Sequence, residues 1–309
     1  MYTNHQNFSF CTLALGTRYR SHACLLAQDI AKHSPGISLI ILTDEPQDFI
    51  DYPHVLAFKH RQQSIGCYHD KRFVIAKALS LFNTCMFVDA DIRILAPFSA
   101  DIKWLPGITA RSCSSIAKHN EIYINSVDTL YKRKRIRELE VLGEISQKLN
   151  LALEGPSVQF VMEMLFVVTK QDGREIEFIK HWETIAHYCE LNGFYGAEGY
   201  AMGLAAAKAE LTVRWDEMTS FVYFKDWVEK QKIKKGQATI EKTLIYFRQH
   251  EAIEYRRYSI LEKINCKINQ IIGFYCRYFY LKIQTLKNFK FYYKDYSLIK
   301  ILFKKNHAL

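Results

Sequence analysis

Residues 8–42 read FSFCTLALGTRYRSHACLLAQDIAKHSPGISLIIL, and this stretch decides the fold class. Its first part, residues 8–15, is a run of β-prone side chains that a glycine closes, and residues 19–32 carry apolar side chains at helical spacing. A Ser-Pro-Gly triplet at 34–36 ends the helix, and the apolar run at 37–42 predicts a second strand. Strand, helix and strand in this order predict a β-α-β unit with buried parallel strands.

The same alternation continues along the chain. Further strands are predicted at residues 85–88, 161–169, 211–215 and 243–247. Helical patterns cover residues 70–82 and 196–208, and another helix is predicted to begin near residue 172. Strands that alternate with helices predict an α/β fold, in which a mixed, mostly parallel sheet is flanked by helices.

Charge divides the chain into two parts. The 309 residues are 49% hydrophobic, which supports a sizeable core. Residues 255–309 hold twelve basic and two acidic residues, which accounts for the whole formal net charge of +10. We therefore predict a near-neutral body over residues 1–254 and a basic, aromatic-rich helical tail over residues 255–309. The neutral body disfavours polyanion binding outside the tail.

Two further features bear on the cellular compartment. The eight cysteines are scattered singly with no CxxC pair, so neither a zinc site nor a disulfide framework is indicated. The first residues carry no basic leader with an apolar run, and no stretch of eighteen consecutive apolar residues occurs. The expected location is the reducing cytoplasm, with peripheral attachment to the inner face of a membrane as the alternative that the tail suggests.

The stretch CMFVDADIRIL, residues 85–95, places Asp89 and Asp91 directly after an apolar run. Ligands of α/β proteins collect beyond the carboxyl ends of strands, and in extended backbone residues two apart point the same way. Two carboxylates facing one point are hard oxygen ligands that suit Mn²⁺ or Mg²⁺ together with the phosphates of a substrate. D-x-D triplets also occur in solvated turns, so the position after a strand is what favours a diphosphate site.

The order of the motifs resembles the nucleotide-diphospho-sugar transferases of the GT-A fold. The matching pieces are TLALGTRYRSHACLLAQDI (12–30), LIILTDEP (39–46), HDKRFVIAKAL (69–79), MFVDADI (86–92) and TLIYFRQH (243–250). The resemblance implies a Rossmann-like GT-A domain with a Mn²⁺ or Mg²⁺ cofactor and a nucleotide-diphosphate sugar donor.

The resemblance also implies the residues of the donor site. The nucleotide sugar would contact Ala14, Leu15, Gly16, Thr17, Tyr19, Asp44, Arg72, Lys77, Asp89 and Ala90. Tyr19 would lie at the base, and Arg72 and Lys77 would contact the nucleotide or brace Asp89. The metal ligands would be Asp89, Asp91 and His250, although the glycine that usually follows such a histidine closely is absent. The alternatives are a simple turn at Gly16 and a solvated helix face at Arg72 and Lys77.

The acceptor side carries fewer signals. Glu198 begins a predicted helix, where enzymes of this kind carry an acid at the acceptor hydroxyl, so Glu198 and Asp91 are the candidate catalytic residues. In an inverting mechanism Glu198 would be the base, and in a retaining one it would position the sugar. The alternative is an acid that stabilises the first turn of a helix. Asp216, Glu217 and Glu163 are weaker candidates.

The tail combines basic and aromatic residues. Such a segment suits the surface of an anionic membrane, where rings lie at headgroup level and lysines contact phosphates. Nucleic-acid binding and plain packing of C-terminal helices are the alternatives, and the neutral body disfavours nucleic acid. A membrane partner would agree with a lipid-linked acceptor.

The leading hypothesis is a metal-dependent glycosyltransferase that moves a sugar from a nucleotide diphosphate to a carbohydrate or lipid-linked acceptor, in the synthesis of cell-surface glycans. A nucleotidyltransferase could use a similar metal site, but no Gly-rich basic loop occurs near the N-terminus. A phosphohydrolase would carry its D-x-D after the first strand. A nucleic-acid-binding protein acting through the tail is the hypothesis from another functional class.

Overall fold

The computed structural model describes residues 7–99, 101–116, 118–120, 129–153, 155, 157–255 and 259–293. Its strands are β1 (Phe8–Ala14), β2 (Ser38–Thr43), β3 (Val55–Lys59), β4 (Thr84–Val88), β5 (Arg93–Ile94), β6 (Gly107–Ala110), β7 (Cys113–Ser115), β8 (Gln159–Val161), β9 (Leu165–Thr169), β10 (Val213–Trp215) and β11 (Tyr223–Phe224). Its α-helices are α1 (Gly16–His33), α2 (Lys71–Leu81), α4 (Thr129–Lys148), α5 (Arg174–Leu191), α6 (Glu198–Lys208), α7 (Asp226–Lys234), α8 (Leu244–Glu254), α9 (Ile260–Leu286) and α10 (Phe289–Tyr293). Short 3-10 turns are η1 (Pro46–Phe49), η2 (Tyr68–Asp70) and η3 (Ile240–Lys242).

A seven-stranded sheet in the order β10-β6-β9-β4-β1-β2-β3 organises the body. The pairs β1–β2, β2–β3, β1–β4 and β10–β6 are parallel, and β9 runs antiparallel to both β4 and β6. The α/β class with a mixed, mostly parallel sheet is therefore confirmed. Because β1, β2 and β4 are parallel, their carboxyl ends meet at one edge of the sheet.

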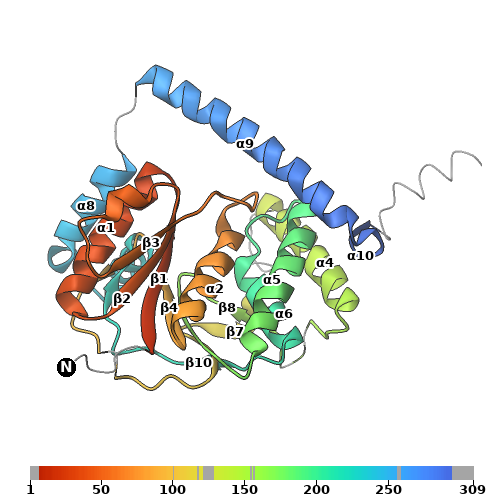
Figure 1. The fold of residues 1–309 in the computed structure, drawn as a ribbon, viewed down its shortest axis with the longest axis horizontal. Helices are drawn as coiled ribbons and strands as arrows, with labels where there is room; N and C mark the ends of the chain where they lie inside the picture. The colour runs from red at the N-terminus through yellow and green to blue at the C-terminus, as the bar shows by residue number, and fades with distance from the viewer. Residues whose placement is uncertain are drawn as a thin grey trace, which may run out of the picture.

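Helices cover both faces of this sheet, and the side-chain alternation of the strands explains why. Phe10 of β1 packs in the core that contains Leu26 of α1, whereas its neighbour Cys11 packs in the core that contains Ile75 of α2 and Trp182 of α5. Figure 1 shows α1 on one side of the sheet and α2, α5 and α6 on the other. Strands buried on both faces need near-continuous apolar sequence, which is the pattern found.

Two predicted strands differ from the structure. Residues 161–169 contain the end of β8 and the whole of β9, with an interruption at 162–164 that faces the cavity described below. Residues 243–247, predicted as a strand, begin helix α8 instead, so that prediction is wrong. The β-prone run TLIYF packs beside α1, and its Phe247 ring lies 4.9 Å from Phe224. Strand preference depends on a sheet neighbour, and among the described residues this segment pairs with no strand.

The tail contains two helices within its described residues, α9 and α10. A capping box starts α9, since the Ser259 hydroxyl accepts from the backbone N–H of Glu262 while the Glu262 carboxylate accepts from the backbone N–H of Ser259. Figure 1 shows α9 crossing from α8 to the far end of the body, where it meets α5. None of the helices in the described part of the chain combines the length and the apolar character needed to cross a membrane.

Candidate functional site

A cavity of about 440 Å³ lies at the carboxyl ends of β1 and β4. Its wall includes Leu15 after β1, residues 66–68, Asp89 and Asp91 after β4, residues 162–164 and the start of α6. This edge of the sheet is where ligands of open α/β sheets bind. The cavity brings together acids from β4, α6 and the 162–164 segment with Lys71 and Lys225.

Asp89 and Asp91 converge on one point in the structure. A tight turn follows β4, because the backbone N–H of Ile92 donates to the carbonyl of Asp89. Both carboxylates then accept hydrogen bonds from the Lys225 ammonium, with 3.0 Å from Nζ to Asp89 Oδ2. The convergence was predicted from extended backbone, but a turn produces it.

Lys71 lies between Asp89 and Glu198 and contacts both carboxylates. Its ammonium lies 3.0 Å from Asp89 Oδ1 and 2.9 Å from Glu198 Oε1, and it donates to the backbone carbonyl of Glu163 at 3.0 Å. The side chain is buried at the first residue of α2. Sequence reasoning missed this lysine, whose signal was its place beside Arg72 in the helix that leads into β4.

The acidic groups that line the cavity outnumber the basic ones. Four carboxyl groups, those of Asp89, Asp91, Glu163 and Glu198, face two ammonium groups. Burial disfavours charge on Asp89, but the two lysines hold its pKa below the ordinary value. Burial raises the pKa of Glu163, and it raises the pKa of Glu198 from 4.5 to about 7. Lys71 stays cationic, since Asp89 and the two glutamates raise its pKa despite burial. Lys71 shares its positive charge between Asp89 and Glu198, so it offsets only part of the negative charge of an ionised Glu198.

A divalent cation fits this donor set. The groups are hard oxygens, as Mg²⁺ and Mn²⁺ prefer. Among the described residues, Glu163 Oε2 and Glu198 Oε2 are buried oxygens with no hydrogen-bond partner. If all four carboxyl groups are ionised, a divalent ion would supply the two positive charges that Lys71 and Lys225 leave uncompensated. Because Lys225 bonds to both aspartates, an ion shared by Asp89 and Asp91 requires the Lys225 ammonium to move aside.

The turn after β1 contains residues that are predicted to contact the nucleotide. Gly16 has φ +80°, a conformation that glycine adopts without strain, and its backbone N–H donates to Asp44 Oδ1 at 3.0 Å. Asp44 also accepts from Arg20 at 2.7 Å, so it fastens this turn from the end of β2. Leu15 and Tyr19 line the cavity.

Three other predicted nucleotide contacts can now be placed. Ala90 lines the cavity beside the aspartates. Ala14 packs in the sheet core and is fully buried, so its side chain does not face the cavity. The Thr17 hydroxyl lies 3.4 Å from the Arg20 guanidinium, on the outer side of the turn.

The prediction for Arg72 and Lys77 is wrong in its details. The Arg72 guanidinium donates to the carbonyl of His69 at 2.9 Å and pairs with Glu183 of α5. The Lys77 ammonium lies over the ring of Phe58, 4.2 Å from its centroid. Helical spacing turns both side chains away from the cavity, and Lys71 is the residue that braces Asp89.

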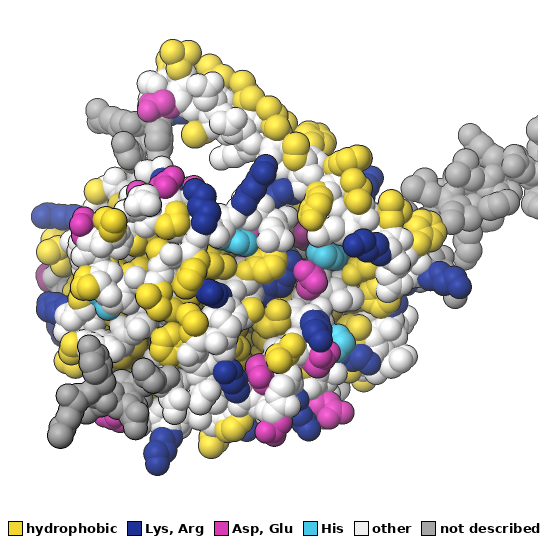
Figure 2. All heavy atoms as spheres, in the orientation of Figure 1, with side chains coloured by type: hydrophobic (Ala, Val, Ile, Leu, Met, Phe, Trp, Pro, Cys, Tyr) yellow, Lys and Arg dark blue, Asp and Glu magenta, His cyan; other side chains and the backbone are white. Residues whose placement is uncertain are grey.

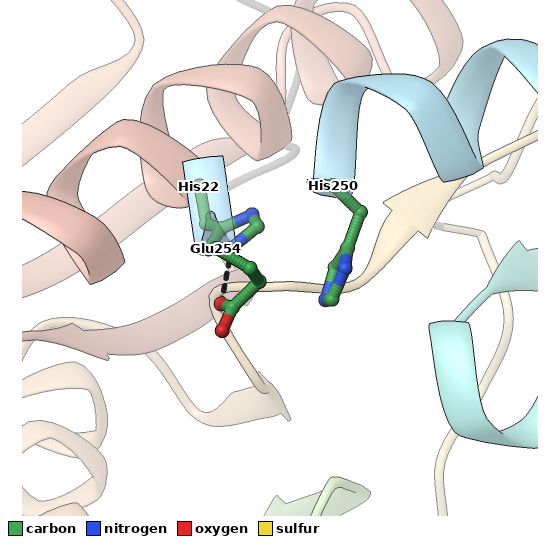
Figure 3. Close-up of side chains that lie close together, drawn as sticks. All are labelled: His22, His250 and Glu254. Atoms are coloured by element: carbon green, nitrogen blue, oxygen red, sulfur yellow. Dashed lines mark hydrogen bonds and ion pairs between the residues drawn. The ribbon is translucent and has the colours of Figure 1, made fainter. Parts of the chain in front are cut away.

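His250 lies in a different group from the one predicted. Figure 3 shows it beside His22 of α1 and Glu254, one turn further along α8. His22 Nε2 is 3.1 Å from Glu254 Oε1, and the two imidazole rings are 5.1 Å apart. Their ligand atoms lie within 4.8 Å of one another, so the three side chains could hold a metal ion. Glu254 already pairs with Arg18 at 3.1 Å, which offsets its charge.

This histidine group adjoins the aspartate pair. Burial lowers the pKa of His22, and the charges of Glu254 and Asp91 act in the opposite direction. Asp91 therefore lies within electrostatic reach of His22, although the carboxylate itself bonds to Lys225. The predicted third ligand is near the site, since His250 Nδ1 lies 3.8 Å from Oδ1 of Asp226, the residue after Lys225, and its ring lies beside that of His22.

The acceptor side of the cavity is built around Glu198. This carboxyl opens α6, and the rings of Tyr68 and Trp227 lie half exposed among the residues that line the cavity. The loop before α2 is fixed by two buried acids: Glu190 accepts from the backbone N–H groups of Ile65 and Gly66, and Asp70 from those of residues 63 and 64. Asp216 and Glu217 are not among the lining residues.

Comparison with known proteins gives no family assignment: no protein-family model matches the chain, and no curated protein matches it.

Proposed function

We propose that this protein is a metal-dependent glycosyltransferase of the GT-A type, which transfers a sugar from a nucleotide-diphosphate donor to a carbohydrate or lipid-linked acceptor. One observation carries the proposal. Two aspartates after a central strand converge on one cation position, inside a cavity where four carboxyl groups face two lysines. A sheet with four parallel pairings and one antiparallel strand beside β4 agrees with this type of fold.

The donor diphosphate would lie at Asp89 and Asp91. A divalent ion bound there neutralises the charge that develops on a departing nucleotide diphosphate. An ion held by Asp89 and Asp91 would require the Lys225 ammonium to leave these carboxylates, and the ammonium would then be available to the phosphate oxygens. Tyr19 and Leu15, from the turn after β1, offer the surface for the base and ribose.

Glu198 has the protonation behaviour of an acceptor-side base. Its pKa of about 7 lets the carboxyl exchange a proton near neutral pH. In an inverting transfer, the acceptor oxygen bonds to the anomeric carbon, the bond from that carbon to the diphosphate oxygen breaks, and Glu198 takes the hydroxyl proton. Lys71 holds Oε1 of this carboxyl, and with the ion at Asp89 and Asp91 the unpartnered, buried Oε2 would be the atom that meets the acceptor hydroxyl. In a retaining transfer, Glu198 positions the acceptor sugar.

The test is thermal stabilisation by nucleotide diphosphates and their sugars, measured with and without Mn²⁺. At least one uridine, guanosine, cytidine or thymidine donor should raise the melting temperature only with metal, because ligand binding stabilises the folded state. Asp91→Ala should abolish the shift. Asp51→Ala removes an exposed acid outside the cavity and is the matched control. If no donor shifts the wild type, the proposal fails.

Product analysis then separates this function from its rival. Release of the nucleoside diphosphate together with a glycosylated product identifies sugar transfer. Release of inorganic diphosphate from a nucleoside triphosphate would instead identify a nucleotidyltransferase.

A further inference from the structure

Helix α9 presents an apolar stripe to solvent. Leu261, Ile264, Ile268, Ile272, Tyr275 and Phe279 recur every three or four residues, which places them on one side of the helix. They are between 48% and 74% exposed. Figure 2 shows hydrophobic side chains along the visible length of this helix. An ordered row of this kind indicates a partner, because soluble proteins normally expose such residues singly.

The other side of α9 already has its partners in the body. Leu281 and Thr285 are buried, and the Phe274 ring lies 5.8 Å from the ring of Tyr195. By helical spacing these three residues lie on the side away from the stripe. The C-terminal half of α9 is therefore fixed against α5 and its following loop, and the stripe faces outward.

Charge indicates what would cover the stripe. Within α9 the only acid in the sequence is Glu262, which is engaged in the cap, whereas Lys263, Lys267, Arg277 and Lys282 are basic. By helical spacing Lys263 and Lys267 lie on the side of Leu281 and Thr285, opposite the stripe, and a second copy packed on the stripe would supply no anionic partner for them. Nucleic acid would match the charge but leave the aliphatic side chains without apolar contact. A helix that lies in the plane of an anionic membrane interface has this arrangement, since its aliphatic side enters the acyl boundary while basic side chains of its polar side reach lipid phosphates at headgroup level.

The fixed end of α9 lies next to the cavity. Tyr195, which contacts Phe274, also packs against Gly66, where an added Cβ would lie 2.9 Å from the Tyr195 carbonyl. Gly66 and Cys67 both line the cavity. A surface bound by α9 would thus lie beside the loop that forms part of the cavity wall.

We propose that the outward stripe of α9 docks the protein on an anionic membrane surface. Resting on the proposed glycosyl transfer, this placement assigns the acceptor to the lipid-linked class, with its sugar or phosphate head entering the cavity past residues 66–68.

Vesicle flotation of the full chain tests the docking. The wild type should float with phosphatidylcholine vesicles that contain phosphatidylserine, and much less with phosphatidylcholine alone. Ile268→Glu combined with Ile272→Glu should lower the floated fraction at least about tenfold, since two charges then enter the apolar boundary. Ile176→Glu, a matched change at an exposed isoleucine of α5, should float like the wild type. Unchanged flotation of the double variant would overturn the proposal.

Two further readouts exclude the other partners. Light scattering of the wild type without lipid should give a monomer, and a dimer that the double variant dissolves would assign the stripe to self-association instead. Salt-sensitive RNA binding without flotation would assign the tail to nucleic acid. Both results would overturn membrane docking.

The Mn²⁺-dependent nucleotide shift keeps this inference distinct from the proposed function. The double variant should retain the shift, because its substitutions lie outside the cavity. Flotation in a protein that shows no nucleotide shift would retain the docking surface but overturn the assignment of a lipid-linked acceptor.

Discussion

Lys71→Met is the substitution that most directly tests the charge arrangement in the cavity. The Lys71 side chain is 8% exposed, and its ammonium contacts Asp89 at 3.0 Å and Glu198 at 2.9 Å. Methionine retains a similar length and can still lie near the ring of Phe87, but it removes the positive charge. The buried Glu198 and the partly exposed Asp89 then lose a counter-charge.

The expected loss follows from what remains. Removing one partner of a buried ion pair costs about 3–5 kcal/mol in the free energy of unfolding. Asp89 keeps Lys225 at 3.0 Å, so the lower end of this range, about 3 kcal/mol, is expected for Lys71→Met. Glu198→Gln should cost about 1 kcal/mol or less, because the amide oxygen can still accept the hydrogen bond of Lys71.

Guanidinium unfolding at neutral pH measures these values, with the slope of the transition as a check on two-state behaviour. In the variant that combines Lys71→Met with Glu198→Gln, the new amide needs no counter-charge, so the loss should be smaller than the sum of the single losses by about 1 kcal/mol or more. A loss below about 1 kcal/mol for Lys71→Met, or strict additivity, would refute the shared-lysine arrangement.

Two other predictions concern stability. Glu198 has a pKa of about 7 in the folded protein and 4.5 as its ordinary value, so the folded state holds a proton that the unfolded chain releases. The free energy of unfolding should therefore fall by up to about 3 kcal/mol as the pH rises between these two values, and Glu198→Gln should flatten that part of the profile in guanidinium titrations. Equal slopes for the two proteins would contradict the raised pKa. Gly203→Ala should lower the melting temperature in calorimetry, since its Cβ would lie 1.6 Å from the backbone carbonyl oxygen of Gln159 in β8, and overpacking costs about 1–3 kcal/mol. Gly143→Ala, which places its Cβ in open space on α4, is the control and should not lower the melting temperature. Equal melting temperatures for the Gly203→Ala and Gly143→Ala proteins would contradict the close approach of α6 to β8.

The spacing of apolar residues predicted the strands of the central sheet and the helices that pack on it. The run at residues 37–42 corresponds to β2, and the helical spacing at 70–82 corresponds to α2. The start of helix α8 was predicted as a strand, because the run TLIYF is rich in β-prone residues. Its contacts with Phe224 and α1 come from distant parts of the chain and set its conformation.

The candidate site divides in a similar way. Asp89 and Asp91 could be found in the sequence, since a charged triplet after an apolar run is a local signal. Their partner Lys225 could not, because that hydrogen bond joins residues 136 apart in the chain. Only the folded path brings the segment before α7 back to the end of β4. For the same reason His250 was found, but its partners His22 and Glu254 were not.

The sequence by itself thus determined the α/β class, the order of most elements and the two acids at the end of β4, because each depends on the spacing of neighbouring residues. Tertiary structure decided which cations meet those acids, the protonation of Glu198 and the direction of the α9 stripe. These properties depend on burial and on distances between segments far apart in the chain, which spacing along the sequence does not encode.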